Sequence, residues 1–253
     1  MILKKDEVTL LPLGIYFDHI SSLFISDLHI GFEKALQKQG IQMPKSSYPE
    51  IKERSREYIE MVKPQNIILV GDIKEDFGEF NFQEFYELKD YFEFLKDLNI
   101  NIEVIRGNHD NYLLPFLKKM EINYHEKFLI MGDTFITHGH LNLEEEIRNS
   151  KAKRIVFGHE HPSIMVRDSS GLNTKFKATI IGDVYSRTLY SLPAFSPLKP
   201  GTEINVADKK DFLSPIFKDA DLDSCVAHLF EEDEWFSFPI RDIRIKEPSF
   251  LSG

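Results

Sequence analysis

Short apolar runs alternate with longer amphipathic stretches through the first two thirds of the 253-residue chain. The runs are rich in β-branched and aromatic residues, which is typical of buried strands, whereas the longer stretches repeat apolar residues every three or four positions, which is typical of helices. The alternation predicts an α/β fold. Predicted strands cover Leu23–Ser26, Asn66–Val70, Ile102–Ile105 and Arg154–Phe157, with a hairpin formed by Phe128–Met131 and Thr134–Thr137. Predicted helices cover Glu33–Gln39, Pro49 to the residue before Pro64, Phe82–Leu98, Leu113–Met120 and Asn142–Ser150.

The pattern changes after Pro162, where helical periodicity becomes scarce. Short strands are predicted there at Ile164–Arg167, Phe176–Ile181, Thr188–Leu192, Val226–Phe230 and Phe236–Ile245. No linker, internal repeat or low-complexity segment separates the two regions. We therefore expect residues 1–253 to form a single domain of the α/β (α+β) class. In this domain, the strands of residues 162–253 build most of a second sheet, and helices flank the resulting two-sheet β-sandwich.

The charge balance of the chain is acidic, with 31 Lys and Arg residues against 41 Asp and Glu residues and a formal net charge of -10. Proteins that wrap nucleic acid usually carry a basic surface, so this balance argues against an extended DNA-binding groove. Bound divalent metal ions would add positive charge locally, which a count of residues does not include.

The single cysteine, Cys225, excludes an internal disulfide and fits a reducing compartment. Its side chain is expected to be a small buried group rather than a nucleophile. The first 13 residues contain only a short apolar run, which Pro12 interrupts, and no later run is long enough to cross a bilayer. The sequence therefore predicts a cytoplasmic protein that does not associate with membranes.

Acid, amide and imidazole side chains follow the predicted strands at the point where each strand ends. Taken alone, each has an ordinary explanation: an aspartate can cap a helix, a Gly-Asn-His-Asp segment can be a β-turn, and a lone histidine is more often structural than a ligand. In an open α/β sheet, however, ligands bind beyond the carboxyl ends of the strands, so these segments are expected to share one site. They are Asp27-Leu28-His29, Gly71-Asp72, Gly107-Asn108-His109-Asp110, His138-Gly139-His140 and Gly158-His159-Glu160-His161.

Seven residues in these segments have the oxygen and nitrogen chemistry of divalent-metal ligands, without thiolates. They are Asp27, His29, Asp72, Asn108, His138, His159 and His161. Seven ligands are too many for one ordinary ion, but they suit two ions that share a bridging carboxylate and clamp the oxygens of a phosphoryl group. His125 and His140 are left as structural histidines. The sequence has no Gly-x-x-x-x-Gly-Lys loop, no Gly-x-Ser-x-Gly elbow and no Cys-x-x-Cys pair that would indicate a different site.

The order Asp-x-His, Gly-Asp, Gly-Asn-His-Asp, His-Gly, Gly-His-x-His between residues 27 and 161 resembles the calcineurin-like metallophosphoesterase superfamily. Three further segments are similar to a compact group of SbcD-related, ICC-like phosphoesterases, which occur in archaea and, in bacteria, beside a DNA ligase. These segments are Gly31-Phe32-Glu33, Gly71-Asp72-Ile73-Lys74 and Leu192-Pro193-Ala194-Phe195-Ser196-Pro197. The resemblance implies a pair of β-sheets flanked by helices. It also implies that Asp72 bridges two metals, one held by Asp27, His29, Asp72 and His161 and the other by Asp72, Asn108, His138 and His159.

The resemblance further implies that His109 faces the scissile phosphate without binding a metal. Glu75 stands three residues after the bridging aspartate, where many family members place Asp or His beside this histidine, so we expect Glu75 to orient His109. Asp76 occupies the position at which the protein-phosphatase branch has a phosphate-binding arginine, which argues against a protein phosphatase. The basic residues nearest the motifs are expected to meet a second phosphate of the substrate, and they are Lys74, Arg106 and Lys34.

These features predict a dinuclear metal-dependent phosphodiesterase, in which a hydroxide between the metals attacks phosphorus and His109 protonates the departing oxygen. Mn²⁺ is the expected ion, with Zn²⁺, Fe²⁺ and Ni²⁺ as alternatives. The expected partner is a phosphodiester in a small molecule or in accessible nucleic acid, because the acidic charge disfavours a long duplex. A DNA-repair nuclease and a non-catalytic scaffold of the same fold are the alternative functions. Scaffolds of this fold tend to lose metal ligands, whereas all seven positions are filled here.

Overall fold

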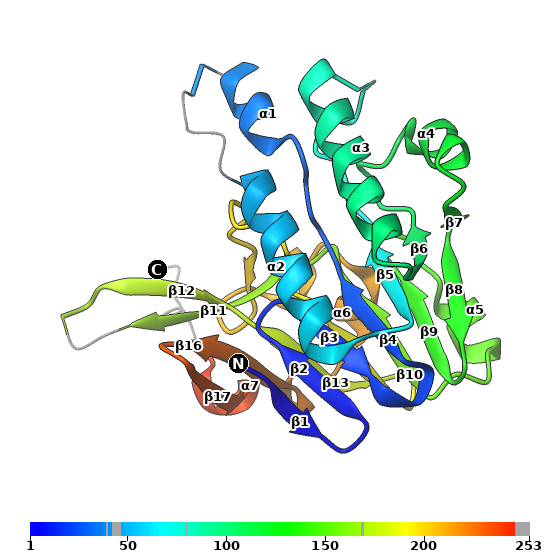
Figure 1. Ribbon diagram of the computed structural model, residues 1–253. Helices are drawn as coiled ribbons and strands as arrows, with labels where there is room; N and C mark the ends of the chain where they lie inside the picture. The colour runs from blue at the N-terminus through cyan, green and yellow to red at the C-terminus, as the bar shows by residue number, and fades with distance from the viewer. Residues whose placement is uncertain (39, 42–46, 79, 168–169, 246–253) are drawn as a thin grey trace.

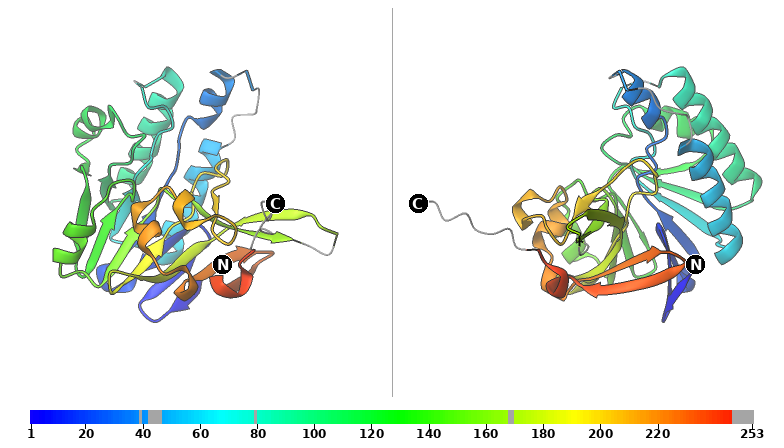
Figure 2. Two further views of the ribbon diagram at one scale, coloured as in Figure 1. Left: turned by 180° about the vertical axis from the view of Figure 1, so that it is seen from behind. Right: turned by 90° about the vertical axis from the view of Figure 1, so that its left-hand side faces the viewer.

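The computed structural model describes residues 1–38, 40–41, 47–78, 80–167 and 170–245. It consists of two seven-stranded sheets that pack face to face, with helices on their outer faces (Figure 1, Figure 2). The first sheet has the order β1 (Leu3–Lys5), β2 (Val8–Leu11), β3 (Gly14–Phe17), β4 (Ser22–Ile25), β5 (Asn66–Val70), β6 (Asn101–Ile105) and β7 (Asn123–His125). The second has the order β17 (Glu234–Pro239), β16 (Val226–Glu231), β13 (Thr179–Val184), β14 (Arg187–Ser191), β10 (Arg154–Phe157), β9 (Thr134–Thr137) and β8 (Phe128–Met131).

A smaller sheet and the helices complete the described part of the chain. The three-stranded sheet has the order β12 (Asn173–Lys177), β11 (Pro162–Arg167) and β15 (Thr202–Glu203), and its β11–β12 hairpin projects from the body of the molecule (Figure 1). The α-helices are α1 (Phe32–Lys38), α2 (Ser47–Val62), α3 (Phe82–Asp97), α4 (Leu113–Lys119), α5 (Glu144–Asn149), α6 (Pro215–Asp219) and α7 (Ile240–Ile243). Short 3-10 helices lie at Asp18–Ile20, Lys209–Asp211 and Leu222–Ser224. No helix in the described ranges is long and apolar enough to span a membrane.

Strand β5 shows how the sequence builds the sandwich. Its side chains alternate between two apolar clusters, because successive residues of a strand point to opposite faces of the sheet. Ile67 and Leu69 pack with residues of α2, α3 and α4, whereas Ile68 and Val70 pack between the two sheets. All four side chains are fully buried, which explains why this strand is a continuous apolar run rather than an alternating one. The outer face of the second sheet is covered in the same way by α5, α6 and α7.

The predicted elements in the first two thirds of the chain are confirmed, with ends that agree or shift by one or two residues. Helix α2 begins at Ser47, two residues before the predicted start, and α5 begins at Glu144, two residues after it. Gln39, the predicted last residue of the first helix, lies outside the described residues. The hairpin of β8 and β9 and the strand β10 have the predicted ends.

The sequence analysis was wrong in four places in the sheets. The strands β1, β2, β3 and β7 were not predicted, because runs of three or four residues are too short to show a period. The single strand predicted at Phe176–Ile181 is two strands of different sheets, separated by Ala178. The strand predicted at Phe236–Ile245 ends at Pro239, which has no N–H to continue a ladder, and α7 follows. Finally, the second sheet does not begin after Pro162, since β8, β9 and β10 already belong to it.

The two sheets place their parallel strands so that the carboxyl ends gather at one edge of the sandwich. In the first sheet, β4, β5 and β6 run parallel to one another, and in the second sheet β9, β10 and β14 do so. The loops that follow these strands are joined to one another by backbone hydrogen bonds, such as Asp27 N–H to the Gly71 carbonyl (3.0 Å) within the first sheet. A bond from Ser196 N–H to the Asp27 carbonyl (3.1 Å) joins a loop of the second sheet to a loop of the first.

Candidate metal centre

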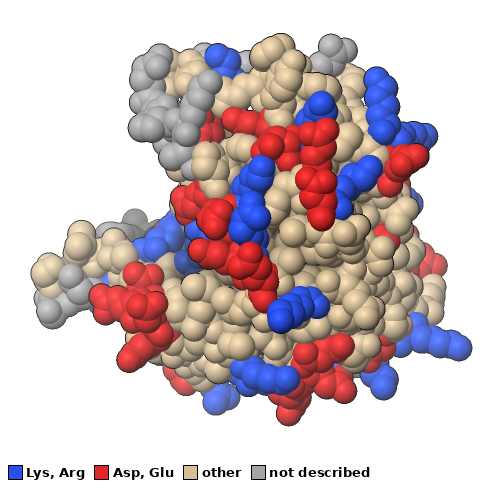
Figure 3. Space-filling model, in the orientation of Figure 1, with Lys and Arg blue, Asp and Glu red and all other residues tan. Residues whose placement is uncertain are grey.

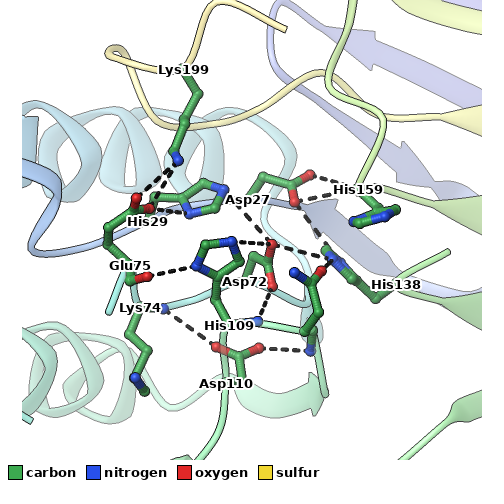
Figure 4. A network of polar contacts seen from close by, with 12 residues as sticks. Asp27, His29, Asp72, Lys74, Glu75, His109, Asp110, His138, His159 and Lys199 are labelled. Atoms are coloured by element: carbon green, nitrogen blue, oxygen red, sulfur yellow. Dashed lines mark hydrogen bonds and ion pairs between the residues drawn. The ribbon is translucent and has the colours of Figure 1, made fainter. Parts of the chain in front are cut away.

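The structure brings the predicted metal ligands together at this edge of the sandwich (Figure 4). Asp27 and His29 follow β4, Asp72 follows β5, Asn108 follows β6, His138 follows β9, and His159 and His161 follow β10. Their donor atoms form two groups, each compact enough to hold an ion. One group is Asp27, His29, Asp72 and His161, and the other is Asp72, His138 and His159.

The contacts within the two groups show where an ion would sit. In the first, His161 Nε2 lies 3.0 Å from Asp27 Oδ1 and 3.4 Å from His29 Nε2. In the second, His138 Nε2 lies 3.4 Å from Asp72 Oδ2 and 3.2 Å from Asn108 Oδ1. Asn108 therefore joins the second group, as the resemblance implies. Carboxylates, imidazoles and an amide that face one another at these distances have the chemistry that divalent transition-metal ions need, so the residues fit a two-metal centre.

The backbone of the ligand loops adopts a conformation that most residues avoid. Five of the seven expected ligands have a positive φ, in the left-handed region: Asp27 (59°), His29 (48°), Asp72 (51°), His159 (65°) and His161 (49°). Such backbone persists only where surrounding structure fixes it, and it is concentrated at functional sites. Here backbone hydrogen bonds fix it, including His29 N–H to the Asp72 carbonyl (3.0 Å).

Two glycines permit the loops to approach the carboxylates closely. A Cβ atom on Gly107 would lie 2.1 Å from Asp72 Oδ1, and one on Gly158 would lie 2.5 Å from Asp27 Oδ2. Any larger residue would displace the ligand that the glycine touches. The Gly107 segment is therefore more than a β-turn, because its glycine makes room for the acid that is expected to bridge the metals.

The electrostatics of the centre depend on pairing between buried acids and imidazoles. Burial alone would raise the pKa of Asp27, but His161 and His138 outweigh burial and hold this pKa at about 2. His138 and His29 likewise hold the pKa of Asp72 well below its usual range despite burial. Burial lowers the pKa of His159 to about 3 and that of His29 to about 4. His138 differs, because Asp72 and Asp27 outweigh its burial and raise its pKa to about 10. Metals bind carboxylates in the ionised form and imidazoles in the neutral form, so an ion in the second group would displace a proton from His138.

Hydrogen bonds on the outer side of the histidines fix which nitrogen faces the centre. His138 Nδ1–H donates to the Val70 carbonyl (2.9 Å), which leaves Nε2 for the second group. His29 Nδ1 lies 2.7 Å from Glu75 Oε2, and its Nε2 faces the first group. A carboxylate behind a metal-binding histidine fixes the ring and increases its basicity as a ligand.

Glu75 was expected to orient His109, and the structure places it in contact with that ring through its backbone rather than its carboxylate. The carboxylate of Glu75 contacts His29, whereas the backbone carbonyl of Glu75 accepts a hydrogen bond from His109 Nδ1–H (2.6 Å). Sequence position cannot distinguish a side-chain contact from a backbone contact at the same residue. The outcome for His109 is still an oriented ring, with Nε2 3.9 Å from Asp72 Oδ2 and directed into the centre (Figure 4).

The basic residues that were expected to contact substrate are occupied elsewhere. Lys74 is fully buried, points away from the centre and donates to the carbonyls of Asp76 and Gly78 (Figure 4). Arg106 donates to Glu126 (2.5 Å) and to Asn111 Oδ1 (2.8 Å), and Lys34 contacts Gln37 within its own helix. Both Lys74 and Arg106 lie next to the motifs in sequence, but their side chains do not point toward the metal centre.

Sequence reasoning missed the basic residue that does lie at the centre. Lys199, in the loop after β14, places Nζ 3.1 Å from Glu75 Oε1 and 3.0 Å from Glu75 Oε2 (Figure 4). The same ammonium lies over the ring of Phe32, 4.5 Å from its centroid. No periodic pattern marks a residue in an irregular loop, so only its neighbours in space identify it. His140, which was left as structural, lies beside the second group, with its ring centroid 5.2 Å from that of His138.

Two carboxylates and a shell of oriented histidines at the ends of parallel strands define a metal-dependent hydrolase centre. A family model, "Calcineurin-like phosphoesterase", matches residues 20–178 of the chain. Among solved structures, the nuclease MPE of Pseudomonas putida shares 16% sequence identity and a TM-score of 0.65, over 94% of this chain and 99% of that one. Yfce, a phosphoesterase from E. coli, aligns at 16% identity over 88% of this chain and 94% of that one, with a TM-score of 0.40. No curated protein matches the sequence.

The chain belongs to the calcineurin-like phosphoesterase family, because the match covers more than half of its length and all of the ligand-bearing segments. Members of this family are hydrolases that use a dinuclear divalent-metal centre, which the two groups around Asp72 fit. The likeness to nuclease MPE shows that the fold is shared.

Removal of the shared carboxylate is the sharpest test of the centre. Asp72→Asn should lose metal from both groups, because Asp72 belongs to each of them, whereas His159→Ala should mainly empty the second. Metal content is measured by elemental analysis after dialysis, with the exposed Asp90→Asn as the control. Two equivalents of metal in Asp72→Asn would contradict the bridging assignment.

The Glu75 carboxylate offers a second test. Glu75→Gln should weaken metal binding at the first group by on the order of 10- to 100-fold, the usual effect of removing an outer partner of a ligand. Glu103→Gln is a matched control, because Glu103 contacts His125 at the same 2.7 Å and His125 is not an expected ligand. Metal titration followed by calorimetry gives the metal affinity of each variant. Equal affinities in the two variants would show that Glu75 does not support metal binding.

Proposed function

We propose that the chain is a metal-dependent phosphodiesterase that hydrolyses phosphodiesters in small molecules or in accessible single-stranded nucleic acid. The observation that carries the proposal is the position of His109: it borders both metal groups, yet its Nδ1 is held by a backbone carbonyl and its Nε2 faces Asp72. The site thus combines a two-metal ligand set with a separate imidazole whose Nε2 faces the centre.

The residues divide the work of hydrolysis among them. The chemistry that a bound pair of divalent ions supplies is the activation of water and the neutralisation of charge on the phosphoryl oxygens. His109 then donates a proton from Nε2 to the departing oxygen, so that the P–O bond breaks to give an alcohol and a phosphomonoester. The Glu75 carbonyl keeps the other ring nitrogen protonated throughout. Lys199 adds a positive charge at the rim, where it meets a substrate oxygen in addition to Glu75.

The surface charge supports a small or locally accessible substrate. The net charge is -10, and Figure 3 shows acidic and basic side chains interspersed over the face that it presents, without a continuous basic track. A long duplex needs many Lys and Arg contacts to its phosphates. A short or single-stranded substrate needs only the few cationic groups that the centre itself supplies. We propose Mn²⁺ as the native ion, because the carboxylate and amide oxygens of the ligand set suit it.

We also propose that the chain is a member of the SbcD-related subgroup, because three of its sequence segments resemble that group. A DNA-repair nuclease is the second candidate, since the fold is shared with the P. putida nuclease MPE. A non-catalytic scaffold is less well supported, because the expected ligands and His109 all converge in the described structure.

The substrate class is tested with the Mn²⁺-loaded protein. We expect bis-p-nitrophenyl phosphate to be hydrolysed faster than p-nitrophenyl phosphate, and single-stranded oligonucleotides faster than the matching duplexes. Binding to duplex DNA should be weak and should decrease steeply with salt. Processive degradation of long duplex DNA at physiological salt would contradict the proposal and favour the repair nuclease.

The role of His109 is tested by its dependence on the leaving group. His109→Ala should keep both metals and lose on the order of 10²–10⁴-fold in rate, which is typical of a missing general acid. The loss should be smallest for p-nitrophenolate, which scarcely needs a proton, and largest for alkyl leaving groups. An equal loss for good and poor leaving groups would show that His109 binds phosphate rather than donating a proton.

A further inference from the structure

An exposed aromatic ring lies directly against the ring of His109. The centroid of Phe77 is 3.8 Å from that of His109, and the two planes are inclined by 32°. Although one face of Phe77 is covered in this way, 52% of the residue remains exposed to solvent. A large apolar group that borders a polar centre and stays exposed has no role in the core.

The loop that carries Phe77 is held rigidly. The buried ammonium of Lys74 donates to the carbonyls of Asp76 and Gly78, the two residues on either side of Phe77. Asp76 N–H also donates to Glu84 Oε1 (3.2 Å), and Gly78 N–H donates to Asp76 Oδ1 (3.0 Å). The ring is therefore presented by a fixed backbone, which lowers the entropic cost of stacking a ligand on it.

Other exposed aromatic side chains occur in the same region of the chain. Six aromatic residues of the described ranges are strongly exposed, and five of them fall between residues 77 and 112: Phe77, Phe82, Phe85, Tyr86 and Tyr112. Phe82 and Tyr86 contact each other with centroids 4.4 Å apart at the start of α3, the helix that follows the Phe77 loop. Of these rings, Phe77 is the one in contact with the centre, and an exposed aromatic ring in such a position is typical of proteins that stack the bases of single strands.

We propose that Phe77 is the stacking platform for a nucleobase of the substrate, next to the phosphate that His109 faces. This inference rests on the proposed phosphodiesterase function and names its substrate class as nucleotidyl phosphodiesters. In a nucleotide, one sugar separates the base from its phosphate, so a phosphate at His109 brings its base to the neighbouring ring. Stacking also resolves the affinity problem of an acidic protein, because it binds nucleic acid without a basic track.

A binding experiment tests the platform independently of catalysis. Thymidine monophosphate and the matching abasic sugar phosphate are titrated by calorimetry into the Mn²⁺-loaded full-length protein. We expect the nucleotide to bind roughly 5- to 100-fold more tightly, the factor that one base–aromatic stack contributes. Phe77→Leu should remove this difference without changing the affinity for the abasic compound, and Phe77→Trp should keep it. Phe236→Leu, which changes an exposed aromatic residue on β17, is the matched control and should behave as wild type.

A kinetic experiment separates stacking from an effect on His109. The substrates are short oligonucleotides that either carry or lack the base beside the cleaved bond. For the substrate that carries the base, Phe77→Leu should raise KM by roughly 5- to 100-fold and leave kcat unchanged. For the substrate that lacks the base, both constants should stay the same. An equal loss of kcat on both substrates would overturn the inference, because Phe77 would then act on His109 rather than on the substrate. Equal binding of the two ligands by the wild type would also overturn it.

The two experiments distinguish this inference from the proposed function. Base-selective binding that depends on Phe77, in a protein that hydrolyses no diester, supports the platform and rejects the phosphodiesterase. Hydrolysis of diesters with no preference for the base rejects the platform and supports the phosphodiesterase.

Discussion

The carboxylate of Asp72 is ionised and buried where the two sheets meet, and the loops around it are arranged to compensate that charge. Removing an ionised acid from water costs several kcal/mol unless opposite charge and hydrogen bonds replace the solvent. Here His109 N–H donates to Asp72 Oδ1 (2.9 Å), while the rings of His138 and His29 face Oδ2. These partners lie in the loops that follow three different strands of the two sheets. The centre therefore depends on the packing of the two sheets, since the partners of Asp72 come from loops of both.

Much of the fold could be predicted from the sequence because its central strands are buried on both faces. The run Ile67–Val70 of β5 contains no polar residue, so both its ends and the polar residues that follow it stand out. The edge strands β1 and β7 have three residues and mixed burial, and they gave no comparable pattern. The strand expected at Phe236–Ile245 failed because a composition rich in apolar residues does not reveal where a backbone stops pairing.

The residues of the candidate site that immediately follow strands could be predicted from the sequence, whereas the other residues of the site could not. Residues that immediately follow parallel strands must meet, so the convergence of the seven expected ligands followed from topology. The direction of a side chain within a loop does not follow from topology. Lys74 therefore donates to the backbone of a loop rather than facing the centre, and Lys199, which lies just outside the Leu192–Pro197 segment, contacts Glu75. For the same reason, no feature of the sequence indicates that Phe77 covers His109.

The left-handed backbone of the ligand loops has a consequence for how the protein acquires its ions. The loops are fixed by hydrogen bonds between their own backbones, such as that from His29 N–H to the Asp72 carbonyl, rather than by ligand geometry alone. A cage that the polypeptide holds in place does not need an ion as a template for folding, unlike a zinc finger. Loading then becomes a late and separate event in the maturation of the protein. Which metal occupies the centre is decided at that moment by the supply in the surroundings as well as by the ligands.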